Sequence, residues 1–255
     1  MSDRRVLVTG ANAGLGLATC LELARRGFQV VGTARSEDKA ALVRAAAADA
    51  GVEVDTRLLD IDDAEGCAAV IDDVRPWGLV NNAGVVDQRL VQEVGDDDAR
   101  ALLETLLVSP MRLVRLSLPH MKAAGSGRIV QVSSSSGRVT FPRLGWYQAE
   151  KHGLEAASDA LRMEVARDGI HVSLVEPGAF GELGSDTVGA IDRLKWFGFL
   201  WSSTEHVADV VAGVLTARVP RARYVVGRDA QLNVVSNHFT PTAVRDRVLR
   251  TVYKL

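Results

Sequence analysis

The chain has 255 residues, of which 47% are hydrophobic and 24% are charged, and its formal net charge is −2. This composition is typical of a globular protein rather than a disordered one, and the charge balance gives no sign of nucleic-acid binding. Cys20 and Cys67 both fall in helical patterns and form no disulfide framework or metal-binding spacing. The first apolar run starts almost at once, without room for a signal peptide or an apolar span, so we expect a cytoplasmic protein.

Short apolar runs alternate with helical patterns along the chain, in a length that suits one α/β domain. Strands are predicted over residues 5–9, 29–33, 53–58, 78–81, 128–133, 171–176 and 223–226. Helices are predicted over residues 15–26, 36–50, 63–74, 97–122, 146–168 and 204–217. The alternation predicts a parallel sheet covered on both faces, which is a doubly wound fold. Residues 182–203 interrupt the rhythm after the sixth strand.

A glycine-spaced turn joins the first predicted strand to the first helix. Gly10, Gly14 and Gly16 are spaced Gly-x3-Gly-x-Gly, which differs from the Gly-x-Gly-x-x-Gly of other dehydrogenases. Glycines let the backbone approach a diphosphate, and the helix N-terminus adds free N–H groups. An ordinary tight turn between strand and helix would have the same pattern, so the turn alone does not decide between the two readings.

Tyr147 and Lys151 stand four residues apart in a helical pattern, which puts them on one face, one turn from each other. A phenol normally titrates near ~10, and a neighbouring ammonium favours the phenolate. We therefore expect Lys151 to lower the pKa of Tyr147 toward neutrality. The pair alone is equally typical of a helix surface, so its meaning depends on the motifs before it.

In their order and spacing, these motifs resemble those of the classical short-chain dehydrogenase/reductase family, from about Arg4 to Val226. The residues that carry the resemblance are Thr9-Gly10, Gly14, Gly16, Asp60, Asn81-Asn82-Ala83-Gly84, Ser134, Tyr147, Lys151 and Pro177-Gly178. The tail from Arg221 onward is similar to tails in the hydroxysteroid/retinol dehydrogenase-like branch. The resemblance implies a single-domain Rossmann fold with a seven-stranded parallel sheet, a substrate lid near residues 182–203 and a C-terminal tail over 228–255.

The resemblance also implies a bound dinucleotide and no metal. The residues expected to contact the dinucleotide are Gly10, Asn12, Gly14, Leu15, Gly16, Arg35, Asp60, Ile61, Asn82, Ala83, Gly84, Tyr147, Lys151, Pro177 and Gly178. NAD-preferring members of the family carry an Asp at the end of the second strand, where this chain has Ala34 followed by Arg35. An arginine can bind a 2′-phosphate with two charge-assisted hydrogen bonds, so we predict NADP(H) over NAD(H). Alternatively, Arg35 is a solvated charge at the end of a strand.

The family's chemistry assigns a role to each of three side chains. Tyr147 is expected to supply a proton to the developing alkoxide, and Ser134 to donate a hydrogen bond to the same oxygen. Lys151 is expected to lower the Tyr147 pKa and to hold the nicotinamide ribose. Residues 133–136 are all serine, so the choice of Ser134 rests on register alone.

Three positions depart from the family's pattern. Leu106 stands where the family has an Asn that shapes a helix kink and a water relay. Pro110 has no N–H to give the Leu106 carbonyl, so either that carbonyl stays free for a water or the relay is lost. Glu182 replaces a Thr that often contacts the carboxamide. Glu150 replaces a small residue near a common subunit contact, so we expect subunit packing to differ there.

Four aromatic residues, Trp196, Phe197, Phe199 and Trp201, gather in the expected lid. They suggest a flat, apolar substrate, although a lid that buries its own aromatics and a patch that touches a membrane are alternatives. We therefore predict an NADP(H)-dependent oxidoreductase that interconverts a carbonyl and an alcohol on a hydrophobic, steroid-, retinoid- or polyketide-like molecule. The alternatives are a non-redox isomerase, lyase or cyclase that uses Tyr147 as acid-base, and a catalytically silent dinucleotide sensor. The apolar helix over 101–118 suggests a homodimer or homotetramer.

Overall fold

A computed structural model of the chain describes residues 4–179 and 202–255. Its centre is a seven-stranded sheet in which every strand pairs in parallel with its neighbours, in the order β3-β2-β1-β4-β5-β6-β7. The strands are β1 (Arg5–Val8), β2 (Gln29–Ala34), β3 (Asp55–Leu58), β4 (Gly78–Asn81), β5 (Gly127–Val132), β6 (Ile170–Pro177) and β7 (Arg223–Val226). All seven lie where the sequence predicted strands, which confirms the seven-stranded parallel Rossmann fold.

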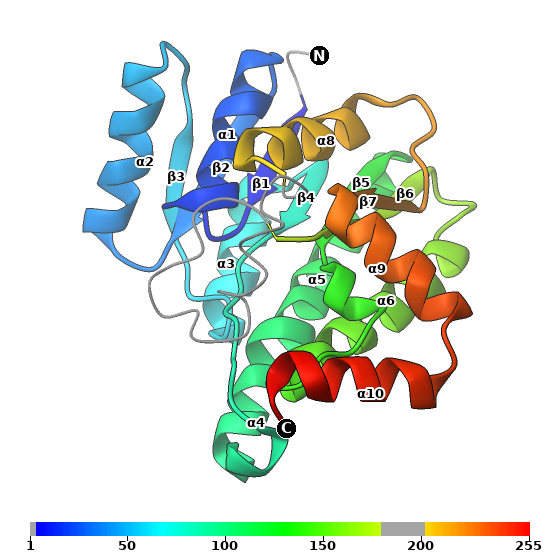
Figure 1. Ribbon diagram of the computed structural model, residues 1–255. Coiled ribbons are helices and arrows are strands. Elements are labelled where there is room, and N and C mark those ends of the chain that lie inside the picture. The colour runs from blue at the N-terminus through cyan, green and yellow to red at the C-terminus, as the bar shows by residue number, and fades with distance from the viewer. Residues whose placement is uncertain (1–3, 180–201) are drawn as a thin grey trace.

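Helices cover both faces of the sheet (Figure 1). The helices are α1 (Gly14–Arg25), α2 (Glu37–Asp49), α3 (Ala64–Val74), α4 (Asp96–Leu103), α5 (Ser109–Ala123), α6 (Gly145–Glu164), α8 (Thr204–Thr216), α9 (Arg228–Phe239) and α10 (Thr242–Tyr253). Side chains alternate across each strand, so Val6 and Val8 pack with α1, α2 and α8, whereas Leu7 packs with α3, α5 and α6. The sheet is therefore buried on both sides, as the alternation of elements predicted.

The helix predicted over residues 97–122 is interrupted by a π-helical segment at Glu104–Val108, called η2. The Ser109 N–H donates to the Glu104 carbonyl, five residues back, instead of four. Pro110 follows directly and supplies no N–H of its own. The extra residue in this turn lets the helical path continue into a proline, so the expected kink is present as a π-bulge of the kind often found at functional sites.

Two short 3₁₀ segments, η1 (Val91–Glu93) and η3 (Ser135–Gly137), lie in the loops after β4 and β5. The tail, expected only as an extension, contains the two helices α9 and α10. Within residues 4–179 and 202–255, no helix is long and apolar enough to cross a membrane. The same residues contain no group of three or more His, Cys, Asp or Glu side chains able to hold a metal ion.

Candidate active site

A cavity of about 310 Å³ opens at the carboxyl ends of β1, β2 and β4. The expected dinucleotide residues that line it are Gly10, Asn12, Leu15, Gly16, Arg35, Asp60, Ile61, Asn82, Ala83 and Gly84. Gly14 lies in the same turn but outside the lining, with a left-handed φ of 52°. The topology therefore brings together residues separated by more than 70 positions, at the edge of the sheet where open α/β proteins bind ligands.

Close packing of backbone shapes the floor of this cavity. Gly10 has a φ of 65°, and a Cβ there would lie 2.9 Å from the Ala83 Cα. A Cβ at Gly16 would lie 2.1 Å from the Gly10 carbonyl oxygen. The Thr9 hydroxyl accepts hydrogen bonds from the N–H groups of Asn82 (2.9 Å) and Ala83 (3.0 Å), which ties the end of β1 to the end of β4. Glycine is therefore required where the two loops meet.

The part of the cavity at the end of β2 carries the residues on which the predicted cofactor choice depends. Ala34 ends β2 and is 2% exposed, whereas Arg35 follows it, is exposed to solvent and lines the cavity. The Asp60 carboxylate accepts a hydrogen bond from the Asp62 N–H at 3.2 Å, which fixes the loop after β3. Arg35 is thus the cation that a group bound at the end of β2 meets first.

Ser134 follows β5 and faces the end of β6. Its hydroxyl donates to the Pro177 carbonyl at 3.4 Å and accepts from the Ser136 N–H at 3.1 Å. Ser133, Ser135 and Ser136 are buried, and Ser134 is the half-buried member of the four. Pro177 and Gly178 therefore lie beside the serine, and they do not line the cavity over the glycine turn.

Tyr147 and Lys151 lie one turn apart on α6. The Lys151 Nζ donates to the Val132 carbonyl at 2.9 Å and lies 5.8 Å from the centre of the Tyr147 ring. Burial lowers the pKa of Lys151 to about 8. Burial raises the pKa of Tyr147, a hydrogen bond with Ser134 lowers it in part, and the charge of Glu150 raises it further. The expectation of a Tyr147 pKa lowered toward neutrality is therefore wrong for the protein alone, because desolvation of the buried phenol dominates.

Leu106 is buried within the π-helical segment, with 1% of its surface exposed. Its Cδ2 lies 2.8 Å from the position that a Cβ on Gly84 would occupy, so it packs directly on the loop after β4. The Pro110 carbonyl accepts a hydrogen bond from the Asn81 side chain at 3.0 Å. Leu106 therefore contacts the cofactor loop through packing, and its side chain offers no hydrogen bond to a relay.

Glu150, near which we expected subunit packing to differ, is buried within its own chain. Its side chain is 0% exposed within its own chain. Neither carboxylate oxygen has a hydrogen-bond partner among the described residues. Burial and the charge of Asp87 raise the pKa of Glu150 to about 7, against the opposing effect of Lys151.

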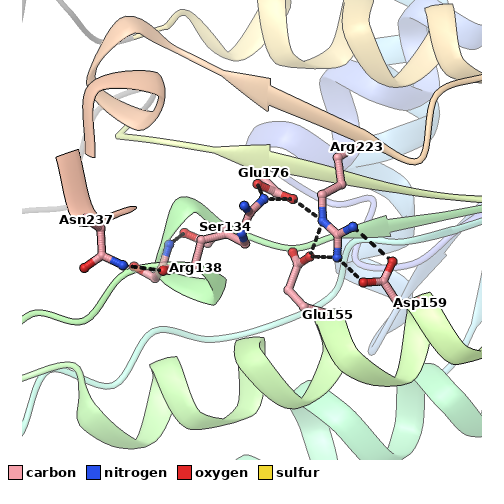
Figure 2. Close-up of polar contacts among 8 residues, drawn as sticks. Ser134, Arg138, Glu155, Asp159, Glu176, Arg223 and Asn237 are labelled. Carbon is pink, nitrogen blue, oxygen red and sulfur yellow. Dashed lines mark hydrogen bonds and ion pairs between the residues drawn. The ribbon is translucent and has the colours of Figure 1, made fainter. Parts of the chain in front are cut away.

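A cluster of charged side chains, here called the ionic cluster, lies between α6, β6 and β7 (Figure 2). It consists of Glu155 and Asp159 from α6, Glu176 from β6, Arg223 from β7 and Arg138 from the loop after η3. The Arg223 guanidinium lies 3.0 Å from both Glu155 and Glu176 and 2.6 Å from Asp159. Asn237 of α9 donates to the Arg138 carbonyl at 3.1 Å, so the tail also reaches the loop that follows Ser134.

Sequence reasoning missed several residues around the site. The Thr105 hydroxyl donates to Asp62 at 2.6 Å, and both residues line the cavity. The Asp229 carboxylate accepts from the Ala179 N–H at 2.7 Å and lies against Gly178. Each of these contacts joins segments far apart in the sequence, so no local sequence pattern predicts it. Glu182 and the lid aromatics Trp196, Phe197, Phe199 and Trp201 lie outside the described residues.

Comparison with known proteins agrees with this geometry. The family model described as short chain dehydrogenase matches residues 4–186. The chain is 30% identical to human 17-beta-hydroxysteroid dehydrogenase type 6, over 98% of this chain and 88% of that protein. It is 29% identical to mouse retinol dehydrogenase 7, with the same coverage. A crystal structure of a metagenomic short-chain oxidoreductase in complex with NADP has 29% identity and a TM-score of 0.75, and the match covers 88% of this chain and 97% of that one. The chain therefore belongs to the short-chain dehydrogenase family of oxidoreductases, within its hydroxysteroid/retinol dehydrogenase-like branch.

Proposed function

We propose that the protein is an NADP(H)-dependent oxidoreductase that interconverts a carbonyl and an alcohol on a hydrophobic small molecule. What supports the proposal is that Ser134 follows β5, that Lys151 of α6 donates to the last residue of β5, and that β5 pairs with β4, whose following loop lines the cavity. The human and mouse relatives are named for a hydroxysteroid and for retinol, which are hydrophobic alcohols. The aromatic composition of residues 196–201 supports the same substrate class.

The cavity fits a dinucleotide phosphate. A side chain at Gly10 or Gly16 would collide with backbone, so these positions leave the turn and the α1 N-terminus open to a diphosphate. Arg35 supports the choice of NADP(H), because it offers a planar, two-pronged donor to a 2′-phosphate and Ala34 offers no carboxylate to repel it. When bound, NADPH supplies the hydride for carbonyl reduction.

Residues of the chain itself would donate the proton that carbonyl reduction requires. Tyr147, whose pKa is raised by burial, holds its proton at neutral pH and can give it to the developing alkoxide. Ser134, which bonds with Tyr147, can donate to the same oxygen. Lys151 is held by the Val132 carbonyl one turn from Tyr147 and can place a positive charge beneath the phenol.

Cofactor preference tests the first half of the proposal. Titration of the purified protein with NADPH and NADH should give tighter binding of NADPH, and Arg35→Ala should remove most of the difference. Arg44→Ala is the matched control, because Arg44 is an exposed arginine on α2 that pairs with Glu37. Equal affinity of the wild type for both cofactors would refute the NADP(H) assignment.

A screen with apolar ketones and aldehydes tests the second half. NADPH oxidation that depends on one of these substrates supports carbonyl reduction. Conversion of a substrate without any change in NADPH would instead support the non-redox alternative. We also propose that the protein is cytoplasmic and forms a homodimer or homotetramer, and a monomeric mass by light scattering at micromolar concentration would refute the second point.

A further inference from the structure

The most unusual buried group of the described residues sits next to the proposed catalytic lysine. Glu150 precedes Lys151 on α6, is 0% exposed, and has two carboxylate oxygens without a hydrogen-bond partner. A buried carboxylate that is neither paired nor hydrogen-bonded carries a large desolvation cost. The same chain pairs its other fully buried glutamate, Glu176, with two arginines. The neighbours of Glu150 must therefore account for the burial of an acid without a partner at this position.

Glu150 projects from α6 toward the π-helical segment. Gly153, one turn further along α6, faces Leu107 of that segment at 2.9 Å from the position of an added Cβ. Residues three apart share a helix face, so Glu150 looks toward the same segment. Leu106 there is buried and offers no hydrogen-bonding side chain. Glu150 is thus the ionisable group that the chain provides on this side of Lys151.

The charge of Glu150 acts in the same direction on both residues of the pair. It raises the pKa of Lys151, and it raises the pKa of Tyr147. Both shifts favour the proton-bound form, which is an ammonium in one case and a neutral phenol in the other. These are the forms that can deliver a proton to an alkoxide.

Most of the other charged groups on the elements packed around this part of α6 form ion pairs. Those near Glu150 or Lys151 are Asp87 with Arg89, Asp98 with Arg89, Glu104 with Arg112, Glu176 with Arg138 and Arg223, and Glu155 with Arg223. Asp87 acts on Glu150, and Glu155 acts on Lys151 more weakly than Glu150 does. Each of these acids has an arginine partner, whereas Glu150 has none among the described residues and faces the charge of Lys151 instead.

We propose that Glu150 is a positioning residue that acts through its charge: it keeps Lys151 an ammonium and Tyr147 a phenol, so that the site rests in its proton-donating state. No proton needs to pass between Glu150 and either neighbour. Glu150 loses its proton to solvent as the pH rises, and the resulting anion delays the loss of protons from Lys151 and Tyr147. The inference deepens the proposed carbonyl reduction and rests on its assignment of Tyr147 and Lys151.

Direct titration of the two side chains tests this without substrate or cofactor. The chain has only five lysines and three tyrosines, so ¹³C labels at lysine Cε and tyrosine Cζ give few resonances by NMR. Lys151→Met and Tyr147→Phe assign the two signals. In Glu150→Gln, both midpoints should fall, by about one pH unit for Lys151. Glu150→Asp, which keeps the charge, should restore most of each shift.

Glu164→Gln is the matched control, since Glu164 is exposed near the end of the same helix. It should leave both midpoints within about 0.2 pH units of the wild type. Unchanged midpoints in Glu150→Gln, or an equal change in Glu164→Gln, would overturn the inference. A protein that reduces no carbonyl but shows both shifts would contradict the proposed function and leave the electrostatic role of Glu150 intact.

Discussion

Helix α6 buries a glutamate on each of its two flanks, and the two glutamates have different surroundings. Glu155 is 5% exposed, and its Oε2 accepts a hydrogen bond from the Arg223 guanidinium at 3.1 Å. Glu150 is 0% exposed and has no partner for either oxygen among the described residues. The ionic cluster around Glu155 joins α6 to β6 and β7 (Figure 2), and burial there is compensated by opposite charge.

The comparison separates two uses of a buried charge. Around Glu155, the Arg223 guanidinium neutralises the carboxylate, and these ion pairs hold α6 on the sheet. Glu150 has no arginine partner in the described part of the chain, and its charge acts on Lys151 and Tyr147, whereas that of Glu155 acts on Lys151 more weakly. A protein bears the cost of an unpaired buried acid where that acid tunes a site, so the first flank should govern stability and the second should govern chemistry.

The largest expected change in stability comes from Arg223→Met. The substitution leaves Glu155, Asp159 and Glu176 without their shared guanidinium, and removing one partner of a buried ion pair is strongly destabilising. We expect a loss of about 3 kcal/mol in the free energy of unfolding at pH 8, measured by urea denaturation. The loss should shrink at pH 5, because burial and Glu155 raise the pKa of Glu176 to about 7.

Arg57→Met is the control for this effect. Arg57 pairs with Asp73 on the surface, where both side chains are largely exposed, so the substitution should cost less than about 1 kcal/mol. An Arg223→Met protein as stable as the control would show that the ionic cluster does not hold α6 to the sheet.

Glu150→Gln should change the free energy of unfolding in the opposite direction and by a similar amount. The folded pKa of Glu150 is about 7, above its unfolded value, so the native state binds the extra proton between pH 4.5 and 7. Stability of the wild type therefore falls as the pH rises through this window. The glutamine variant lacks this loss, so it should be about 3 kcal/mol more stable than the wild type at pH 8 and within about 1 kcal/mol of it at pH 5.

Urea denaturation at the two pH values, with Glu164→Gln alongside, measures this directly. A glutamine variant that is less stable than the wild type at pH 8 would mean that Glu150 finds a stabilising partner in solution, and the contrast between the two flanks would disappear.

The smallest effect is expected at Leu106. If the charge of Glu150 maintains the proton-donating state, an amide at position 106 adds little, and Leu106→Asn should change turnover by less than about threefold. The same substitution at Leu107 is the control for the cost of a buried amide, because Leu107 lies on the same segment against Gly153. A rise of tenfold or more in the Leu106 variant alone would show that a side-chain relay was missing and that Glu150 does not replace it.

Much of the fold could be predicted because it depends on periodicities that each segment carries by itself. Most of the strands contain a short apolar run, although β3 is largely polar, and all seven lie within a few residues of their predicted positions. The dinucleotide residues were predictable because a glycine turn and the Asn82-Ala83-Gly84 loop follow strands, and parallel topology gathers the ends of strands at one edge.

The features that escaped prediction depend on long-range contacts or on a single hydrogen bond. The π-helical segment differs from the predicted helix by one residue per turn, which leaves no clear mark on the apolar pattern. Helix α10 repeats Val244, Val248 and Val252 at helical spacing but buries no side chain fully, and no helix was predicted there. Burial of Glu150 runs against the preference of the residue type, and the partners of Arg223 lie 47 to 68 positions away in the sequence.

The central claim is that Tyr147 of α6 is the proton donor, and one comparison tests it most directly. The rate of NADPH oxidation with an apolar ketone should be measured for the wild type and for Tyr147→Phe, with NADPH affinity and unfolding free energy determined on the same preparations. The account predicts a rate at least ~100-fold lower in the variant, since a general acid typically contributes that much, with affinity and stability nearly unchanged. A variant rate within about tenfold of the wild type would contradict the assignment of Tyr147 as the proton donor.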